Sequence, residues 1–576
     1  MDRVPQIDSI LSGMDSIRLS RRNVLKTSLA LSVGGALLAA CADDDADDDA
    51  APAVETDDEA ETDDAEPDTD DDAAEDDHDD DAAELDGTYG GELIVALSGE
   101  MLTLDMHEVS ATNLNLVGWH IYETLFTWDE EYAVIPMLAE SHEVSDDGLT
   151  HNIALRQGVM FHNGEEMTAE DVVASLERWS ENYGFAQELL GAVDELNQPD
   201  DYSLEMILNR PVGTMAAGLA QTGRGPAIYP ASVVAESTTD DLAEYIGTGP
   251  YQFVEWDRAS HLIIERFEDY AALDGEPNGY GGHKYAYIDQ MRFTPVPDES
   301  ARQAGLSTGE YHFLETVPSD LFETMENDPE IVTELLPPIA WSVFIINMNS
   351  PLTGNETIRK AIQAALDMEP ILQSGFGDGF FRLDPGLMSQ ETVWHSTAGE
   401  EYYNMADPDL ARELLEEAGY DGEPLVWTAT QEYADHYNRT FVAAQQLEAV
   451  GFNIDFQVKD WATILAEQSD DSIWDITTTG TTLRPDPGSL FLLNVCDVAG
   501  WWCDEETIDL MEQLRTESDF DTRFEIFEQI QTNVYEQVPF IKNGDTMALT
   551  ARHHTVHNLS PLLMIGPILW NCWLEQ

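Results

Sequence analysis

The chain has 576 residues, 43% of them hydrophobic, and this length predicts two or three lobes rather than a single core. Acidic residues outnumber basic ones by 114 to 25, which gives a formal net charge of −89 at pH 7. A surface this acidic repels nucleic acid phosphates and anionic membrane surfaces, so the composition excludes both as partners. Residues 42–86 contain 26 acidic residues and no Lys or Arg, yet residues 87–576 still carry −65. We interpret the excess as a halophile's adaptation to brine, because molar salt shortens the Debye length to about 3 Å.

The first 41 residues indicate export. Residues 20–26 read Ser-Arg-Arg-Asn-Val-Leu-Lys, which predicts a twin-arginine signal. The apolar segment 27–40 is shorter than the ~20 residues that cross a bilayer, so it indicates a signal peptide rather than a membrane span. The sequence Leu-Ala-Ala-Cys ending at Cys41 resembles a lipobox, and we predict that Cys41 is lipid-modified and anchors the chain to the outer face of the cell membrane. The alternative is a plain signal peptide followed by a chance cysteine.

The acidic tract that follows predicts a disordered tether over residues 42–87. Asp, Glu, Ala and Thr dominate it, and such a composition cannot bury enough apolar surface to fold. Repulsion between its charges keeps it extended. A purely solubilising tail would have the same sequence, so that alternative stays open.

The body begins at residue 88, and predicted strands and helices alternate along it in an α/β pattern. We expect strands at 91–97, 150–155, 251–255, 342–347 and 454–458, and helices at 169–179, 356–365, 408–418, 438–450 and 521–536. The helix at 408 has the clearest signals: Asp407 as its cap, Pro408 in the first turn and Gly419 at its end.

Cysteine and histidine positions carry weaker signals. Cys496 and Cys503 bracket a short loop, which suits a disulfide in an oxidising compartment and does not suit a zinc ligand pair. Cys572 lies in an apolar run and is expected to be a buried small hydrophobe. The group His553, His554 and His557 indicates either a metal-binding pair or a solvated turn. No H-E-x-x-H motif is present, so we predict the turn, with no metal site and no cofactor.

Several ordered sequence blocks carry a resemblance to a known family. They are residues 122–178 (with Phe-His-Asn-Gly at 161–164), 247–253, 306–310, 358–367, 407–420 and 538–541. Together they resemble the extracellular solute-binding proteins of the peptide/nickel (oligopeptide/dipeptide) ABC importer family, over essentially all of 88–576. With the leader and the acidity, the chain resembles a haloarchaeal-type lipoprotein of that family.

The resemblance implies a two-lobed, periplasmic-binding-protein-like α/β clamp of three domains. Lobe I is expected over 88–340 with a small domain inserted at about 131–243, and lobe II over 341–545. Residues 546–576 would return to lobe I. Two crossing strands near 341–349 and 541–551 would form the hinge, and a ligand between the lobes would close them.

The family's ligand anchors are only partly present in this sequence. Peptide-binding members hold the peptide's amino group with an Asp three residues before an Asp/Glu-Pro pair, and here Leu483 stands at that position before Asp486. The Arg that dipeptide-specific relatives carry near 429–434 is absent, and Arg439 falls in the following helix. The predicted ligand-binding residues are Trp341, Tyr433, Trp461, Arg484 and Asp486. The alternative role of each aromatic residue is interlobe or core packing, and the alternative for Arg484 and Asp486 is that they pair with each other.

The predicted function follows from the resemblance. The chain is expected to be a non-enzymatic, monomeric substrate-binding lipoprotein that captures peptides or a similar small organic solute outside the cell. It would deliver the solute to ABC permease and ATPase subunits, and its only membrane contact would be the lipid anchor. The alternative is a solute-binding accessory of a membrane sensor or chemoreceptor. A G-x-S-x-G match at 305–309 follows a predicted helix, the reverse of the strand–turn–helix order that a nucleophile elbow requires, so we expect no catalysis there.

Overall fold

The computed structural model describes residues 87–239, 241–258, 260–482, 484–493, 496, 498–560 and 568–575. The predicted signal peptide, Cys41 and the tether up to residue 86 lie outside these residues, and so does Leu483. Within them, no helix is both long and apolar enough to cross a bilayer.

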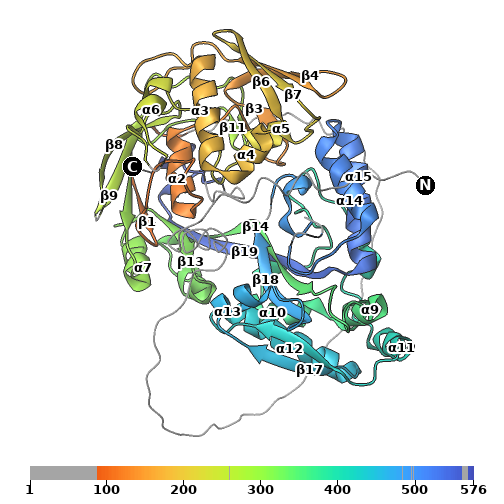
Figure 1. The fold of residues 1–576 in the computed structure, drawn as a ribbon. Coiled ribbons are helices and arrows are strands. Elements are labelled where there is room, and N and C mark those ends of the chain that lie inside the picture. The colour runs from red at the N-terminus through yellow and green to blue at the C-terminus, as the bar shows by residue number, and fades with distance from the viewer. Residues whose placement is uncertain are drawn as a thin grey trace, which may run out of the picture. The chain divides into compact units, whose positions relative to one another are not determined.

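One eleven-stranded sheet runs through the described body (Figure 1). Its strand order is β17-β16-β18-β14-β19-β13-β1-β12-β9-β8, with β15 paired to β19. The bounds are β1 Glu92–Leu97, β8 Tyr251–Asp257, β9 His261–Arg266, β12 Gln290–Pro295, β13 Phe313–Val317, β14 Ile331–Ile346, β15 Phe381–Arg382, β16 Pro424–Ala429, β17 Asn453–Val458, β18 Ile476–Thr482 and β19 Phe540–His553.

Two long antiparallel strands, β14 and β19, connect the two halves of this sheet. The first half of β14 pairs with β19 from Ile331 opposite His553 to Leu336 opposite Ala548. From Ala340 onward β14 pairs with β18 as well. The register shifts between Leu336 and Ala340, where Pro337 and Pro338 supply no N–H donors to the ladder. These two strands therefore cross from lobe I to lobe II at the proline pair, as the two-lobed clamp requires.

Lobe I is built around β1, β8, β9, β12 and β13. Its helices include α2 (Thr112–Ile121) and α7 (Glu299–Ser307). A separate four-stranded sheet has the order β4-β5-β7-β6. Those strands are β4 Ala139–Val144, β5 Thr150–Leu155, β6 Val193–Asp200 and β7 Ser203–Leu208; the helices that accompany them are α3 Ala169–Asn182, α4 Gly184–Leu190, α5 Met215–Leu219 and α6 Ala231–Glu236. The large core cluster of lobe I joins both sheets, from Leu93 in β1 to Met206 in β7.

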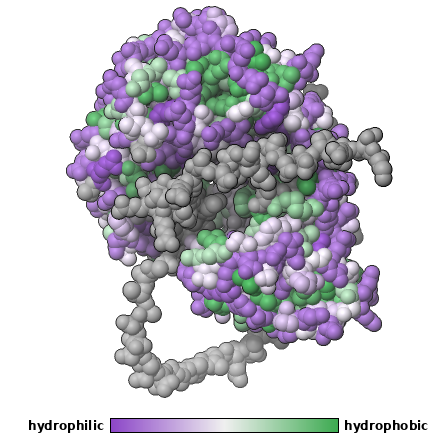
Figure 2. All heavy atoms as spheres, in the orientation of Figure 1, coloured by the Kyte–Doolittle hydropathy of each residue, from purple (hydrophilic) through white to green (hydrophobic). Residues whose placement is uncertain are grey.

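Lobe II packs its helices against the lobe II strands of the sheet, in two cores (Figure 1). They are α9 Glu356–Ala365, α10 Met368–Phe376, α11 Pro408–Ala418, α12 Ala434–Val450, α13 Trp461–Glu467, α14 Glu505–Thr516 and α15 Phe520–Gln537. One core includes Trp427 and the inner faces of α9 and α12, and the other includes Trp341 and α15. Polar residues cover most of the face drawn in Figure 2, as expected for so acidic a chain.

The elements with local end signals match the sequence predictions closely. Strand β5 and helices α9 and α11 have the predicted bounds. The Asp407 side chain accepts hydrogen bonds from the N–H groups of Asp409 and Leu410, and Gly419 ends α11 with a φ of 69°. Thr168 forms a reciprocal capping box with Asp171 at the start of α3.

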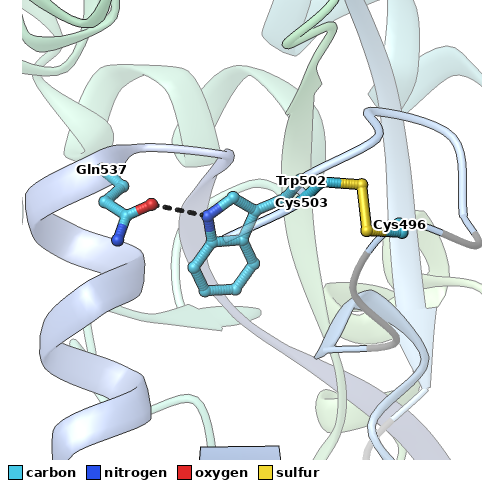
Figure 3. The surroundings of a disulfide bond; sticks show 4 residues. All are labelled: Cys496, Trp502, Cys503 and Gln537. Carbon is cyan, nitrogen blue, oxygen red and sulfur yellow. Dashed lines mark hydrogen bonds between the residues drawn. A yellow bond between two sulfur atoms is a disulfide. The ribbon is translucent and has the colours of Figure 1, made fainter. Parts of the chain in front are cut away.

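The loop between residues 496 and 503 is closed by a disulfide in the structure (Figure 3). The Cys496 N–H donates to the carbonyl of Trp502, and the Trp502 indole N–H donates to Oε1 of Gln537 at the end of α15, at 2.8 Å in each case. The Met348 N–H also donates to the Gly500 carbonyl. The loop is therefore tied to α15 and to the segment that follows β14. Cys572 is free and buried.

Candidate functional site

The carboxyl ends of three parallel strands meet on lobe II. Strand β16 lies between β17 and β18 and runs parallel to both, so the strand ends at Ala429, Val458 and Thr482 share one edge. Thr482 pairs with Ala340, beside the proline pair where β14 crosses to lobe I. Open α/β sheets bind ligands at this edge. We call the segments that leave it, residues 430–433, 459–461 and 484–487, the lobe II edge.

The corresponding edge of lobe I lies at the same crossing. Strand β1 runs parallel to β13, which ends at Val317 opposite Leu549 of β19. Leu549 in turn pairs with Leu335 of β14, two residues before Pro337. The carboxyl ends of parallel strands from both lobes therefore point to the crossing, which is the geometry of a clamp that holds a ligand between its lobes.

Two of the predicted ligand residues come together at the lobe II edge. Tyr433 precedes α12 and Trp461 begins α13, and their ring centroids lie 5.5 Å apart in an edge-to-face arrangement. His436 completes the group, with its ring 5.1 Å from Tyr433 and 5.3 Å from Trp461. Both predicted aromatics are half-buried, so part of each ring faces solvent. We call these three rings the aromatic triad.

The triad also contains polar atoms without partners. Among the described residues, neither the buried Nε1 of Trp461 nor the buried Nδ1 of His436 has a hydrogen-bond partner. Burial lowers the pKa of His436 to about 4, against the opposing charge of Asp435, so its imidazole is neutral near pH 7. Buried polar groups of this kind are normally satisfied, and at a ligand edge an incoming polar group can satisfy them.

The two charged candidates do not pair with each other. Arg484 is exposed just beyond β18. Asp486 is buried, forms an ion pair with Arg523 of α15 at 2.9 Å, and accepts a hydrogen bond from the Gly488 N–H at 2.8 Å. Asp486 therefore fixes the loop that carries Arg484, and it can reach a ligand only by leaving Arg523.

Trp341 occupies the core beneath this edge. It is 1% exposed, and its ring lies 5.8 Å from that of Phe540. It pairs in register with Thr481 of β18 and Asp545 of β19. Its buried Nε1 has no hydrogen-bond partner among the described residues.

Sequence reasoning missed the role of Arg439. This residue is fully buried in α12, where its guanidinium donates to Oδ1 of Asn543 at 2.7 Å and to Oδ2 of Asp435 at 3.0 Å. Arg439 thereby connects the start of α12 to the crossing strand β19. Asn543 lies far away in the sequence, so only the tertiary structure identifies this bridge.

A second buried charge network lies on β19 itself. Asp545 pairs with Lys542 at 2.6 Å and with Arg382 of β15 at 2.9 Å, and both Asp545 and the neighbouring Asp384 are fully buried. Burial raises the pKa of Asp545. Burial also opposes ionisation of Asp384, but His395 and Lys542 outweigh it and hold its pKa below the usual value. The network fixes the crossing strand on its lobe II side.

Lobe I contains a small pocket of about 20 Å³, which is room for one or two water molecules and not for a solute. Its lining includes Glu123 and Lys284, an ion pair of 2.9 Å that is almost completely buried. Glu123 also accepts hydrogen bonds from the hydroxyls of Tyr270 and Thr248. We assign this pocket to the scaffold of lobe I.

The G-x-S-x-G match lies where α7 ends. Ser307 is the last residue of that helix, a turn and β13 follow, and the Ser307 hydroxyl donates to Asp328 at 2.7 Å. The order is helix–turn–strand, as the sequence predicted, and it lacks the geometry of a nucleophile elbow.

A two-lobed α/β clamp with its parallel strand ends at the crossing defines the class of periplasmic-type solute-binding proteins. The family of bacterial extracellular solute-binding proteins, family 5 (middle), matches residues 133–501, and the chain belongs to that family.

Curated relatives agree with this assignment. The chain is 27% identical over 496 residues to a probable peptide ABC transporter periplasmic-binding protein, y4tO, of Sinorhizobium fredii, which covers 81% of this chain and 91% of that protein. It is 26% identical over 380 residues to the glutathione-binding protein GsiB of Escherichia coli K12, covering 65% of this chain and 71% of that protein.

Solved structures share the fold. The ABC transporter substrate-binding protein CtaP of Listeria monocytogenes has a TM-score of 0.74 at 21% identity, covering 85% of this chain and all of that one. The oligopeptide-binding protein AppA of Bacillus subtilis, in complex with a nonapeptide, has a TM-score of 0.61 at 21% identity and the same coverage. The protein NikA of Brucella suis, in complex with Fe(III)-EDTA, has a TM-score of 0.70 at 21% identity, covering 84% of this chain and all of that one.

Proposed function

We propose that this protein captures a peptide outside the cell and delivers it to the membrane subunits of an ABC importer. The proposal rests on the lobe II edge, where the aromatic triad follows the carboxyl ends of β16 and β17, with two half-buried rings and two buried polar atoms that lack partners among the described residues. Peptides present both apolar side chains and backbone polar groups, which suit such a surface. The peptide-related names of y4tO and AppA support this solute class.

Each predicted ligand residue has a proposed role. Tyr433 and Trp461 contact the solute's side chains, and Arg484 meets its carboxylate as a planar fork. Asp486 binds the amino group of the solute if it breaks its ion pair with Arg523. Trp341 packs in the core and supports β14. Because Leu483 replaces the family's amino-group anchor, we expect the specificity to differ from that of dipeptide-binding relatives.

The proposed setting is the outer face of the cell membrane of a halophile. The twin-arginine motif and the Leu-Ala-Ala-Cys sequence support export followed by lipidation of Cys41. On this proposal, Cys41→Ser releases the exported protein into the medium, whereas the wild type sediments with membranes. Equal release of both proteins would contradict the anchor.

Thermal melting against a solute panel tests the function. The purified protein is kept in about 2–3 M KCl to screen its charge, and melted with peptides, nickel–histidine, sugars and amino acids. A peptide that binds only the folded state raises stability by about 2.7 kcal/mol at one hundred times its dissociation constant. A shift with another solute class and none with peptides would overturn the peptide assignment. No shift with any class would contradict solute binding itself.

A further inference from the structure

Three potential metal-ligand side chains meet at the end of the lobe I halves of β14 and β19 that lies away from the lobe II edge. Glu330 immediately precedes β14, and His553 and His554 lie at the end of β19. One potential ligand atom from each of the three residues lies within 4.8 Å of the others. The strand pairing brings them together, because Ile331 lies opposite His553 and the His554 N–H donates to the Glu330 carbonyl at 2.9 Å.

From this geometry we propose, in place of the metal-free turn that the sequence predicted, that Glu330, His553 and His554 form a site for a divalent transition-metal ion of the Zn²⁺ class. Two imidazoles and one carboxylate are a common donor set for zinc, with a fourth position left for water. The site is separate from the lobe II edge, and it connects the start of β14 to the end of β19.

The distances suit an ion better than direct contacts between the side chains. Oε2 of Glu330 lies 3.3 Å from Nδ1 of His554 and 3.8 Å from Nε2 of His553. The longer separation is beyond hydrogen-bond range. Donors bound at about 2.0–2.1 Å in tetrahedral geometry lie roughly 3.3–3.4 Å from one another. The Glu330–His554 separation therefore matches ligand–ligand spacing, and the other pairs, all within 4.8 Å, must close slightly around an ion.

The imidazole of His553 has a hydrogen-bond partner that suits metal coordination. Nδ1 of His553 lies 2.8 Å from the Thr555 hydroxyl. When that nitrogen carries the proton, Nε2 keeps its lone pair and faces Glu330, as the second shell of a metal site commonly arranges. His553 is buried, whereas His554 and Glu330 are 43% and 50% exposed, so an ion can enter from solvent.

A competition titration of the purified protein tests the site. Zinc chloride is added in molar KCl with excess Mg²⁺, which occupies weak carboxylate sites, and a chromophoric chelator reports free Zn²⁺. We expect the wild type to withdraw one equivalent of Zn²⁺ from the chelator. His554→Ala and Glu330→Gln should each weaken that binding by about tenfold or more. Both side chains are substantially exposed, so the variants are expected to fold.

The matched control is His261→Ala. His261 forms an exposed pair with Glu255 at 2.9 Å and has no second histidine in a comparable cluster among the described residues. This variant should bind Zn²⁺ as the wild type does. Equal affinity in all four proteins, or no withdrawal of Zn²⁺ by the wild type, would overturn the proposal.

Discussion

At the scale of single residues, Glu123 and Lys284 form a buried ion pair in lobe I. Both side chains are almost fully excluded from solvent, and Lys284 also lies 4.7 Å from the Trp570 ring. Removing one partner of such a pair leaves an uncompensated buried charge.

We expect Lys284→Met to lower the free energy of unfolding by about 3–5 kcal/mol, because it leaves the Glu123 carboxylate buried without its cation. Urea denaturation at constant KCl measures the loss. The double variant Glu123→Leu with Lys284→Met should recover only part of it, because no lone charge remains but the hydroxyls of Tyr270 and Thr248 lose their acceptor.

Lys360→Met is the matched control for this prediction. Lys360 pairs with Glu356 one turn away on α9, and both side chains are exposed. Such pairs contribute at most about 0.5 kcal/mol. If both lysine variants lost the same stability, burial of the lobe I pair would not be the cause.

Residue type and chain position predicted part of the candidate site. Tyr433 and Trp461 follow strands at the carboxyl edge, and the structure brings their rings together. The contacts of Asp486 and Arg439 were not predictable, because their partners Arg523 and Asn543 lie on distant elements. A sequence read locally carries no signal for such pairings.

At the scale of elements, local signals decided which boundaries could be predicted. Helix α11 has a cap, a proline and a terminal glycine, and its bounds were predicted correctly. Helix α12 begins at Ala434, four residues before the predicted start, and Tyr433 makes no capping hydrogen bond through its side chain. Strand β14 was predicted only over 342–347 but begins at Ile331, on the other side of Pro337 and Pro338. Pairing with β19 continues the strand on both sides of them.

The disulfide between Cys496 and Cys503 is expected to stabilise the protein. The variant Cys496→Ser with Cys503→Ser should be less stable by about 2–3 kcal/mol, because the bridge closes a loop of fewer than ten residues in the unfolded chain. Thermal melting with and without reductant measures this. Reductant should lower the melting temperature of the wild type and leave the double variant unchanged. An equal effect on both would assign the loss to something other than this bridge.

At the scale of the whole molecule, net charge is the dominant feature. Residues 87–576 carry a net charge of −65, and these charges repel one another. At 0.1 M salt the Debye length is about 10 Å, so the salt screens this repulsion only weakly. We expect the melting temperature to rise steeply between 0.1 and 2 M KCl. Sucrose at the same osmolality screens no charge, so it should raise the melting temperature by less. A melting temperature independent of KCl would contradict adaptation to brine.

Calorimetric titration shows whether the solute binds at the lobe II edge. The peptide that gives the largest melting shift is titrated into the wild type, Trp461→Ala and Trp256→Ala. Trp256 is also half-buried, but it lies on β8 at the far end of the sheet. We expect Trp461→Ala to bind about tenfold or more weakly, which corresponds to a loss of roughly 1.4 kcal/mol. Trp256→Ala should bind as the wild type does. Unchanged affinity in Trp461→Ala would contradict the placement of the solute at this edge.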